Sequence, residues 1–165
     1  MKNAHAIVTQ DLEYICENLK TEFAQMAGKR LLITGGAGFL GYYLVQAILH
    51  WNKHALPPQI IRVTVFDNYM RGVPDWLLKL ENDPTLCLVK HNIIAPLPTE
   101  MADYAWIIHA AGIASPIYYR AHPIETMDAN VNGLRNLLEY CRQQKMNGKP
   151  VEGFLFYSSS EIYGD

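Results

Sequence analysis

A glycine-rich run directly follows a short apolar segment near the start of the chain. Its letters are TGGAGFLG, at positions 34–41. Gly35 permits a tight turn after a strand, Gly38 lets a pyrophosphate approach the backbone without meeting a Cβ atom, and Gly41 lets the following helix pack close to the sheet. The start of that helix would offer unpaired N–H groups and the positive end of a dipole to the phosphates. An ordinary glycine-rich turn is the alternative interpretation. The predicted contacts come from Gly35, Gly38, Phe39, Leu40 and Gly41.

An acidic residue ends the next strongly apolar segment. Residues 60–66 read IIRVTVF and are followed by Asp67. A carboxylate at the end of the second strand can accept hydrogen bonds from both hydroxyls of an adenosine ribose and can repel a 2′-phosphate. This arrangement favours NAD over NADP. Two alternatives stay open, because Arg71 could accept a 2′-phosphate and Asp67 could simply begin a loop.

Strand-like and helix-like segments alternate along the rest of the chain. The patterns predict strands at residues 30–34, 60–66, 86–89, 106–109 and 154–157, and helices at 39–51, 76–80 and 123–145. Strands that alternate with helices imply right-handed crossovers and a parallel sheet covered on both faces. We therefore expect an α/β domain with a doubly wound parallel-sheet Rossmann fold at residues 29–165.

Residues 1–28 precede this alternation and form an N-terminal extension. A helix is predicted at residues 9–27, with Thr9 as its N-cap, Asp11 in its first turn and Gly28 as its end. Because the segment comes before the first strand, we expect an extra helix that packs on the domain. Contact with another subunit is the second possibility.

Composition and charge exclude several classes of protein. The net charge is -2, so no basic field is available to hold nucleic acid. No apolar run is long enough for a membrane span and the first ten residues do not resemble a signal peptide, so we expect a cytoplasmic protein. Cys16, Cys87 and Cys141 lie far apart, which predicts reduced, mostly buried thiols and no metal site.

Six ordered motifs resemble the extended short-chain dehydrogenase/reductase family of nucleotide-sugar epimerases, dehydratases and decarboxylases. They are TGGAGFLG (34–41), FDNYMRG (66–72), HNI (91–93), HAAGIASP (109–116), NVNGLRNLLEYC (130–141) and FYSSSEIYGD (156–165). Within the family, the Ala-Ser-Pro at 114–116 and the Ser-Ser-Glu at 159–161 are most similar to those of the UDP-glucuronate decarboxylases. The dTDP-glucose dehydratases have Asp in place of Ser160.

The resemblance implies further contacts to NAD. Asn68 and Gly72 would line the adenosine ribose, and Asn92 and Ile93 would flank the adenine. The family usually has Asp at position 92, but an amide keeps a carbonyl acceptor for the adenine amino group. Three residues would pass beneath the nicotinamide side of the cofactor, and a fourth would anchor the central helix unless it is an ordinary polar surface residue. These residues are Ala110, Ala111 and Gly112, and then Asn130.

The resemblance also implies the chemistry. The family reaction begins with hydride transfer from the sugar C4 carbon to NAD, and the resulting ketone permits decarboxylation, elimination or epimerisation. Ser159 would hydrogen-bond the C4 oxygen, and Ser160 and Glu161 would serve the later step, with Glu161 as general acid or base. A polar strand exit without chemistry is the alternative interpretation of these three residues.

The proton-transfer pair of the family has no counterpart in the chain. No Lys has a Tyr four positions before it, and Tyr140 and Lys145 miss that spacing by one residue. The Tyr-x-x-x-Lys motif is expected just beyond Asp165, followed by further strands and a C-terminal substrate domain. We therefore expect a Rossmann domain truncated after its fifth strand, inactive alone, whose parent enzyme takes a nucleotide-sugar substrate and which forms a homo-oligomer. A non-catalytic NAD-binding module for regulation or assembly is the alternative.

Overall fold

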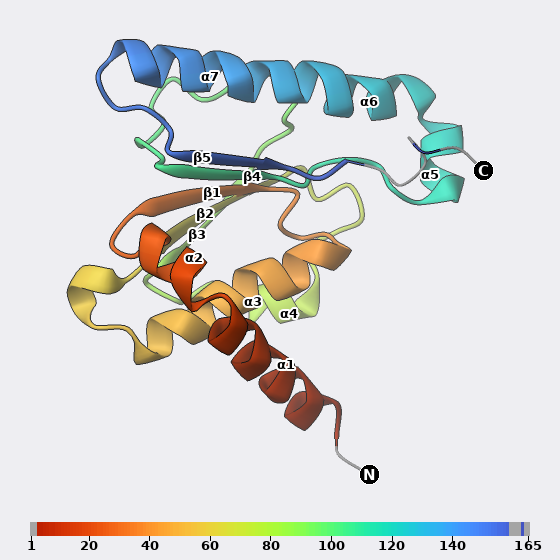
Figure 1. Ribbon diagram of the computed structural model, residues 1–165. Helices are drawn as coiled ribbons and strands as arrows, with labels where there is room; N and C mark the ends of the chain where they lie inside the picture. Colours follow the sequence, from red (N-terminus) through yellow and green to blue (C-terminus); the bar gives the residue numbers. More distant parts are fainter. Residues whose placement is uncertain (1–2, 159–162, 164–165) are drawn as a thin grey trace.

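A single parallel sheet forms the centre of the computed structural model, which describes residues 3–158 and residue 163 (Figure 1). Within these residues the sheet has five strands in the order β3-β2-β1-β4-β5. Their bounds are β1 Arg30–Thr34, β2 Arg62–Asp67, β3 Leu86–Lys90, β4 Trp106–His109 and β5 Gly153–Phe156. The predicted doubly wound parallel-sheet fold is confirmed.

The sheet separates two apolar clusters because successive side chains of a strand point to opposite faces. Leu31 and Ile33 of β1 join the cluster on the face covered by α3 (Phe39–His54), and α4 (Asp75–Leu78) lies on the same side. Leu32 joins the cluster on the other face, which α7 (Leu134–Met146) covers. Parallel strands covered on both faces are mostly apolar, which explains why the four residues of β1 after Arg30 are buried.

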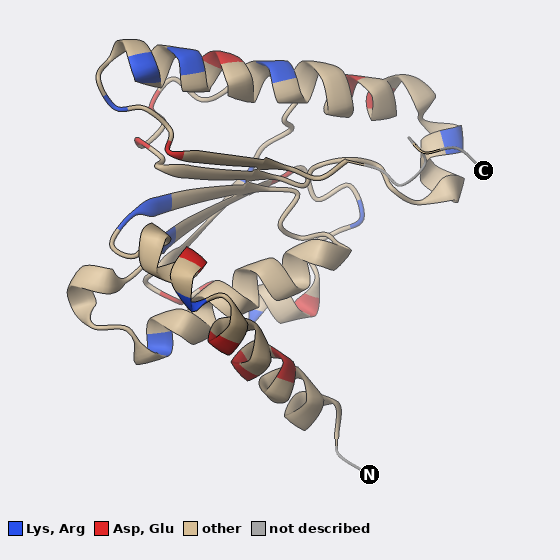
Figure 2. Ribbon diagram, viewed as in Figure 1, with Lys and Arg blue, Asp and Glu red and all other residues tan. Residues whose placement is uncertain are grey.

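Charged residues lie at the ends of the strands and on the outer helices (Figure 2). Arg30 and Arg62 open β1 and β2, and Asp67 and Lys90 close β2 and β3. A charge in the middle of a covered strand would lose its hydration. Asp67 therefore lies where a strand can carry a carboxylate, at the edge of the sheet that faces the loops.

The N-terminal extension is two helices instead of one. These are α1 (Ala4–Asn18), which packs against α3, and α2 (Lys20–Met26), whose Phe23 ring stacks on Trp51 of α3. The predicted cap at Thr9 is wrong. Asn3 caps α1 by accepting a hydrogen bond of 2.8 Å from the Ala6 amide, and the Thr9 hydroxyl inside the helix donates to the His5 carbonyl at 3.0 Å.

The prediction that Gly28 ends the helical segment is confirmed. Gly28 follows α2 with φ +76°, a left-handed conformation that favours glycine, and a Cβ atom there would lie 2.6 Å from the Pro58 carbonyl oxygen. Pro58 belongs to the 3-10 turn η1 (Pro57–Gln59), which delays β2 to Arg62 instead of residue 60.

The predicted helix at residues 123–145 is interrupted. It consists of α6 (Pro123–Asp128), a π-helical turn η2 (Ala129–Gly133) and α7. A short helix, α5 (Pro116–Ala121), precedes it and was not predicted. Proline at the first turn of both α5 and α6 fits a helix start, since that position needs no N–H donor.

Two further expectations were that no segment spans a membrane and that the three cysteines are reduced and mostly buried. None of the helices within the described residues has the length and apolar content that crossing a bilayer requires. The three cysteines are free thiols, but the expectation that they are mostly buried is wrong. Cys87 is exposed on β3, which is an edge strand of the described sheet, and Cys16 and Cys141 are only partly covered.

Candidate nucleotide-binding site

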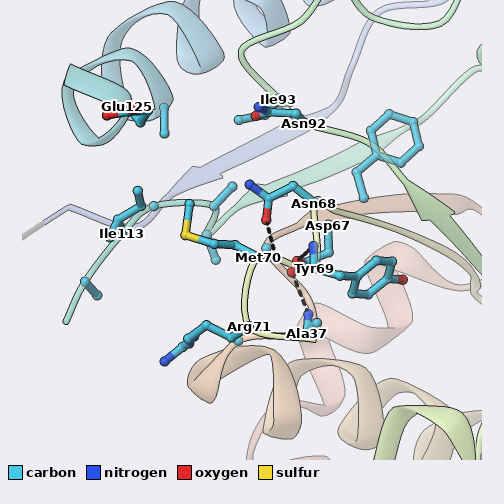
Figure 3. Close-up of a pocket in the computed structure, with 18 of the residues that line it drawn as sticks. Ala37, Asp67, Asn68, Tyr69, Met70, Arg71, Asn92, Ile93, Ile113 and Glu125 are labelled. Atoms are coloured by element: carbon cyan, nitrogen blue, oxygen red, sulfur yellow. Dashed lines mark hydrogen bonds between the residues drawn. The ribbon is translucent and has the colours of Figure 1, made fainter. Parts of the chain in front are cut away.

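A pocket lies at the carboxyl ends of the first four strands, where open α/β sheets bind ligands (Figure 3). Loops that follow β1, β2, β3 and β4 supply most of its lining, and α5, α6 and η2 supply the rest. The lining residues are Gly35, Ala37, Gly38, residues 66–72, residues 91–94, residues 110–115, Tyr118, Glu125 and Ala129.

The glycine-rich turn forms one wall of this pocket. Gly35 has φ +74°, and a Cβ atom on it would lie 2.6 Å from the Ala110 carbonyl oxygen, so only glycine fits between the ends of β1 and β4. A Cβ atom on Gly38 would lie 3.1 Å from the Gly35 carbonyl oxygen, and the absence of one keeps the turn open. The turn joins β1 to α3, as predicted.

Three of the predicted phosphate contacts do not line the pocket. Phe39 and Leu40 begin α3 with exposed side chains. Gly41 is buried, and a Cβ atom on it would collide with the Gly36 carbonyl group, so Gly41 brings the first turn of α3 against the loop. Because the first amides of a helix have no intrahelical acceptor, contact through their backbone N–H groups stays a prediction.

The Asp67 carboxylate connects the first two loops. Its Oδ2 atom accepts a hydrogen bond of 3.0 Å from the Ala37 amide in the glycine-rich turn, and its Oδ1 atom accepts one of 2.8 Å from the Tyr69 amide. Each carboxylate oxygen keeps a further acceptor position. Asp67 is only partly buried and lines the pocket, so these positions can receive ribose hydroxyls.

The loop after β2 folds back on itself. Tyr69 has φ 53°, an uncommon conformation for a residue with a side chain, and its carbonyl accepts the Gly72 amide at 2.8 Å. Asn68 accepts the Met70 amide at 2.9 Å. The Arg71 guanidinium points away from Asp67 (Figure 3). Sequence reasoning named Asn68, Arg71 and Gly72 but missed Tyr69, whose strain has no sequence signal.

The loop after β3 forms the opposite wall. Asn92 and Ile93 both line the pocket, as does His91, which sequence reasoning did not select. The His91 amide donates to the Asp67 carbonyl at 2.9 Å, and its ring packs against Phe66 with 5.1 Å between centroids. Burial lowers the pKa of His91.

The exit of β4 supplies small residues, as expected. Ala110, Ala111 and Gly112 all line the pocket. A Cβ atom on Gly112 would lie 3.2 Å from the Asn130 side-chain oxygen, which places Asn130 beside this loop. Asn130 itself is exposed and belongs to η2, and π-helical turns are frequent at functional sites.

A buried polar pair lies at the base of the site. His109, at the end of β4, is fully buried, and its Nδ1 atom lies 2.6 Å from the Thr34 hydroxyl at the end of β1. Burial lowers the pKa of His109 to about 4, so the ring is neutral. The pair fixes two strand ends beside Gly35 and Ala110. The sequence did not predict this pair, because no local pattern shows which strands lie side by side.

The residues predicted for catalysis, Ser159, Ser160 and Glu161, lie outside the described residues. Glu125 is the acidic side chain that the structure adds to the pocket, from α6 (Figure 3). Its place could not be predicted, because the path of the chain between β4 and α6 depends on two proline-started helices.

Strand order, glycine-rich turn and acid at the end of β2 together define a dinucleotide-binding Rossmann domain. The profile of the NAD dependent epimerase/dehydratase family matches residues 31–165. The chain belongs to this family, whose cofactor is NAD.

Several UDP-glucuronic acid decarboxylases are similar to this chain. UDP-glucuronic acid decarboxylase 6 of Arabidopsis thaliana is 36% identical over 136 residues, which is 82% of this chain and 35% of that protein. UDP-glucuronic acid decarboxylase 1 of Danio rerio is 33% identical over 83% of this chain and 29% of its own length. The chain spans about a third of the length of these relatives.

Nucleotide-sugar enzymes are among the solved structures that this fold matches. A UDP-N-acetylglucosamine 4-epimerase from Methanobrevibacter ruminantium matches with TM-score 0.66 and 26% identity over 84% of this chain and 40% of that one. A dTDP-glucose 4,6-dehydratase from Streptomyces venezuelae with NAD bound matches with TM-score 0.59 and 27% identity over 70% of this chain and 36% of that one.

Proposed function

We propose that the pocket binds NAD, with the diphosphate on the glycine-rich turn, the adenosine ribose on Asp67 and the adenine between Asn92 and Ile93. The observation that carries this proposal is the hydrogen bond between the Asp67 carboxylate and the Ala37 amide. It brings the ribose acceptor and the phosphate turn together at the mouth of one pocket, where the two parts of an adenosine diphosphate need them.

The residues present fit the cofactor. Gly38 has φ -74°, so no backbone strain requires glycine there, and what its missing Cβ atom leaves is space beside the turn. Ala110, Ala111 and Gly112 leave the floor of the pocket free of large side chains. A dinucleotide is long and has a flat ring at each end, and a pocket floor of small residues leaves room for such a molecule.

We also propose a role for the chain in a longer enzyme that modifies a nucleotide-sugar, with UDP-glucuronate as the substrate that the relatives' names suggest. NAD, when bound, supplies a hydride acceptor. Ser159 would donate a hydrogen bond to a sugar oxygen, Ser160 would support the next step, and Glu161 would hold or release a proton. The chain alone should not turn over substrate, because it lacks Tyr-x-x-x-Lys. Self-association also stays a proposal.

Binding of NAD tests the first proposal. We expect calorimetry to show one site on the wild-type chain and at least a tenfold loss of affinity in Gly38→Ala, because the added methyl group occupies the diphosphate position. Gly148→Ala is the matched control. Gly148 has φ +75° with no atom within 4 Å of an added Cβ and does not line the pocket, so that variant should lose stability and keep NAD affinity. Equal NAD affinity in wild type and Gly38→Ala would contradict the proposal.

An assay of substrate turnover tests the second proposal, that the chain alone is inactive. With NAD and UDP-glucuronate supplied, we expect the pure chain to release no carbon dioxide. Release by the 165-residue chain would contradict its dependence on a proton-transfer pair that it lacks.

A further inference from the structure

Asn136 makes an unusual set of contacts from α7 to the loop after β3. Its side-chain amide nitrogen lies 2.9 Å from the Ile93 carbonyl oxygen, 3.3 Å from that of Ile94 and 3.1 Å from that of Ala95. An amide NH₂ has two hydrogens, so three acceptors share them. Three successive carbonyl groups converge on one side chain only if the backbone between them curves around it.

The same loop is held at a second point. Ile93 is 4% exposed, and a Cβ atom on Gly133 in η2 would lie 2.8 Å from its Cγ2 atom. Gly133 thus lets the helical run approach the loop, and Asn136 lies one turn further along. The loop also closes on itself, because the Ala95 amide donates to the Asn92 carbonyl at 2.9 Å and the Ile94 amide lies 3.3 Å from the Asn92 side-chain oxygen.

These contacts stand directly behind the wall of the pocket. Asn92, Ile93 and Ile94 line it, whereas Asn136 does not. The carbonyl groups that Asn136 holds belong to the residues that follow Asn92 in the chain. A shift of this arc would therefore move the Asn92 amide and the Ile93 backbone, which face the position proposed for the adenine.

We infer that Asn136 is a positioning residue for the base-binding end of the pocket. It acts through the backbone of residues 93–95 and makes no contact with the ligand itself. The inference rests on the proposed NAD site and assigns to one side chain the placement of the wall that recognises the adenine. The glycine-rich turn and the exit of β4 do not depend on it.

Two fragments of the cofactor separate this role from a general effect on packing. Each fragment carries a ribose and a phosphate, but AMP carries the adenine and nicotinamide mononucleotide carries the nicotinamide. In Asn136→Asp, an acceptor replaces the donor and faces three carbonyl oxygens, so the arc should open. We expect the affinities for AMP and NAD, measured by calorimetry, to fall about tenfold. The affinity for nicotinamide mononucleotide, measured by ligand-observed NMR, should stay within twofold of wild type.

Asn132→Asp is the matched control. Asn132 is exposed on η2, and its side chain donates to Asp128 at 2.8 Å, so the substitution adds the same charge and removes a hydrogen bond without touching the loop. All three ligand affinities should remain those of the wild type. Asn136→Ala removes the donor without adding charge and should show the same selectivity with a smaller loss.

Three results would overturn the inference. Equal losses for AMP and nicotinamide mononucleotide in both Asn136 variants would show that Asn136 only supports packing. Unchanged AMP affinity would show that the arc does not need it. Failure of the wild-type chain to bind either AMP or NAD would remove the proposed function together with this inference.

Discussion

At the scale of single residues, we propose that Asp67 decides which dinucleotide the pocket accepts. Its position at the end of an apolar strand could be predicted from the sequence. Its two backbone hydrogen bonds, from Ala37 and Tyr69, could not, because they depend on how two loops meet. Tyr69 and the buried His109 were missed for the same reason. The local sequence pattern therefore identifies candidate binding residues, whereas contacts between distant segments determine the orientation of their side chains.

Asp67→Asn should reduce the preference for NAD. The amide is a weaker acceptor for ribose hydroxyls and no longer repels a 2′-phosphate, so NAD affinity should fall about tenfold while NADP affinity stays or rises. Asp83→Asn is the control, since Asp83 accepts the Thr85 amide at 2.8 Å in a similar turn but does not line the pocket. An unchanged NAD-to-NADP ratio in Asp67→Asn would contradict this assignment.

Asn92→Asp should bind NAD several-fold more tightly. A carboxylate accepts a stronger hydrogen bond from the adenine amino group than an amide carbonyl does. It can also accept the Ile94 amide that Asn92 Oδ1 accepts at 3.3 Å. Parallel calorimetry of the variant and the wild type gives the ratio of affinities. Weaker binding by the variant would mean that the adenine amino group does not face position 92.

At the scale of helices and strands, the hydrophobic pattern located most elements, and a side-chain cap set the start of the first helix. The bounds of β1 and β4 were predicted correctly, because buried parallel strands are continuous apolar runs. The first helix begins at Ala4, five residues before the predicted Thr9, because Asn3 provides an equally good cap. The interruption at η2 could not be predicted from a local pattern. It lies where Gly133 packs closely against Ile93, which belongs to a distant segment of the chain.

Asn52 connects α3 to the segments that directly precede β2 and β3, and it should matter for stability alone. Its buried side chain in α3 donates to the Ile61 carbonyl at 2.8 Å and to the Thr85 hydroxyl at 3.1 Å, and accepts the Ile61 amide at 2.9 Å. Asn52→Ala should lower the free energy of unfolding by about 2–4 kcal/mol, because both polar groups of Ile61 lose their partner.

Urea denaturation measures this loss. Asn18→Ala is the control, because Asn18 is exposed and donates only to the Tyr14 carbonyl of its own helix at 2.8 Å. It should change the free energy of unfolding by less than about 0.5 kcal/mol. Equal effects of the two substitutions would show that the Asn52 contacts do not hold α3 to the sheet.

At the scale of the whole molecule, the parallel sheet covered on both faces could be predicted from the alternation of strands and helices, whereas the order of its strands comes from the structure. The arrangement of the residues proposed for catalysis could not be predicted in the same way. Ser159, Ser160 and Glu161 lie outside the described residues, and the chain spans about a third of its decarboxylase relatives. Leu155 and Phe156 of β5 remain exposed, at an edge of the described sheet.

Global stability should fall in mild acid through His109. Burial lowers its pKa from the ordinary value of 6.5 to about 4. Between these values the unfolded chain binds more protons than the folded one, so stability is complete above pH 6.5 and declines as pH drops toward 4. The decline attributable to His109 is on the order of 3 kcal/mol.

Urea denaturation at several pH values tests this dependence. His109→Gln should flatten the slope, whatever its effect on stability at neutral pH. His50→Gln should remove a smaller part, because partial burial also lowers the pKa of His50 on α3. A slope in His109→Gln equal to that of the wild type would mean that folding does not lower the pKa of His109.

The claim on which the account depends is that residues 34–41 and Asp67 form one binding site for NAD. Parallel calorimetric titrations of the wild-type chain with NAD and with NADP test it most directly. The account predicts one site for NAD and at least tenfold weaker binding of NADP, because the carboxylate faces the position of the 2′-phosphate. Absence of binding by either dinucleotide, or equal or tighter binding of NADP, would contradict it.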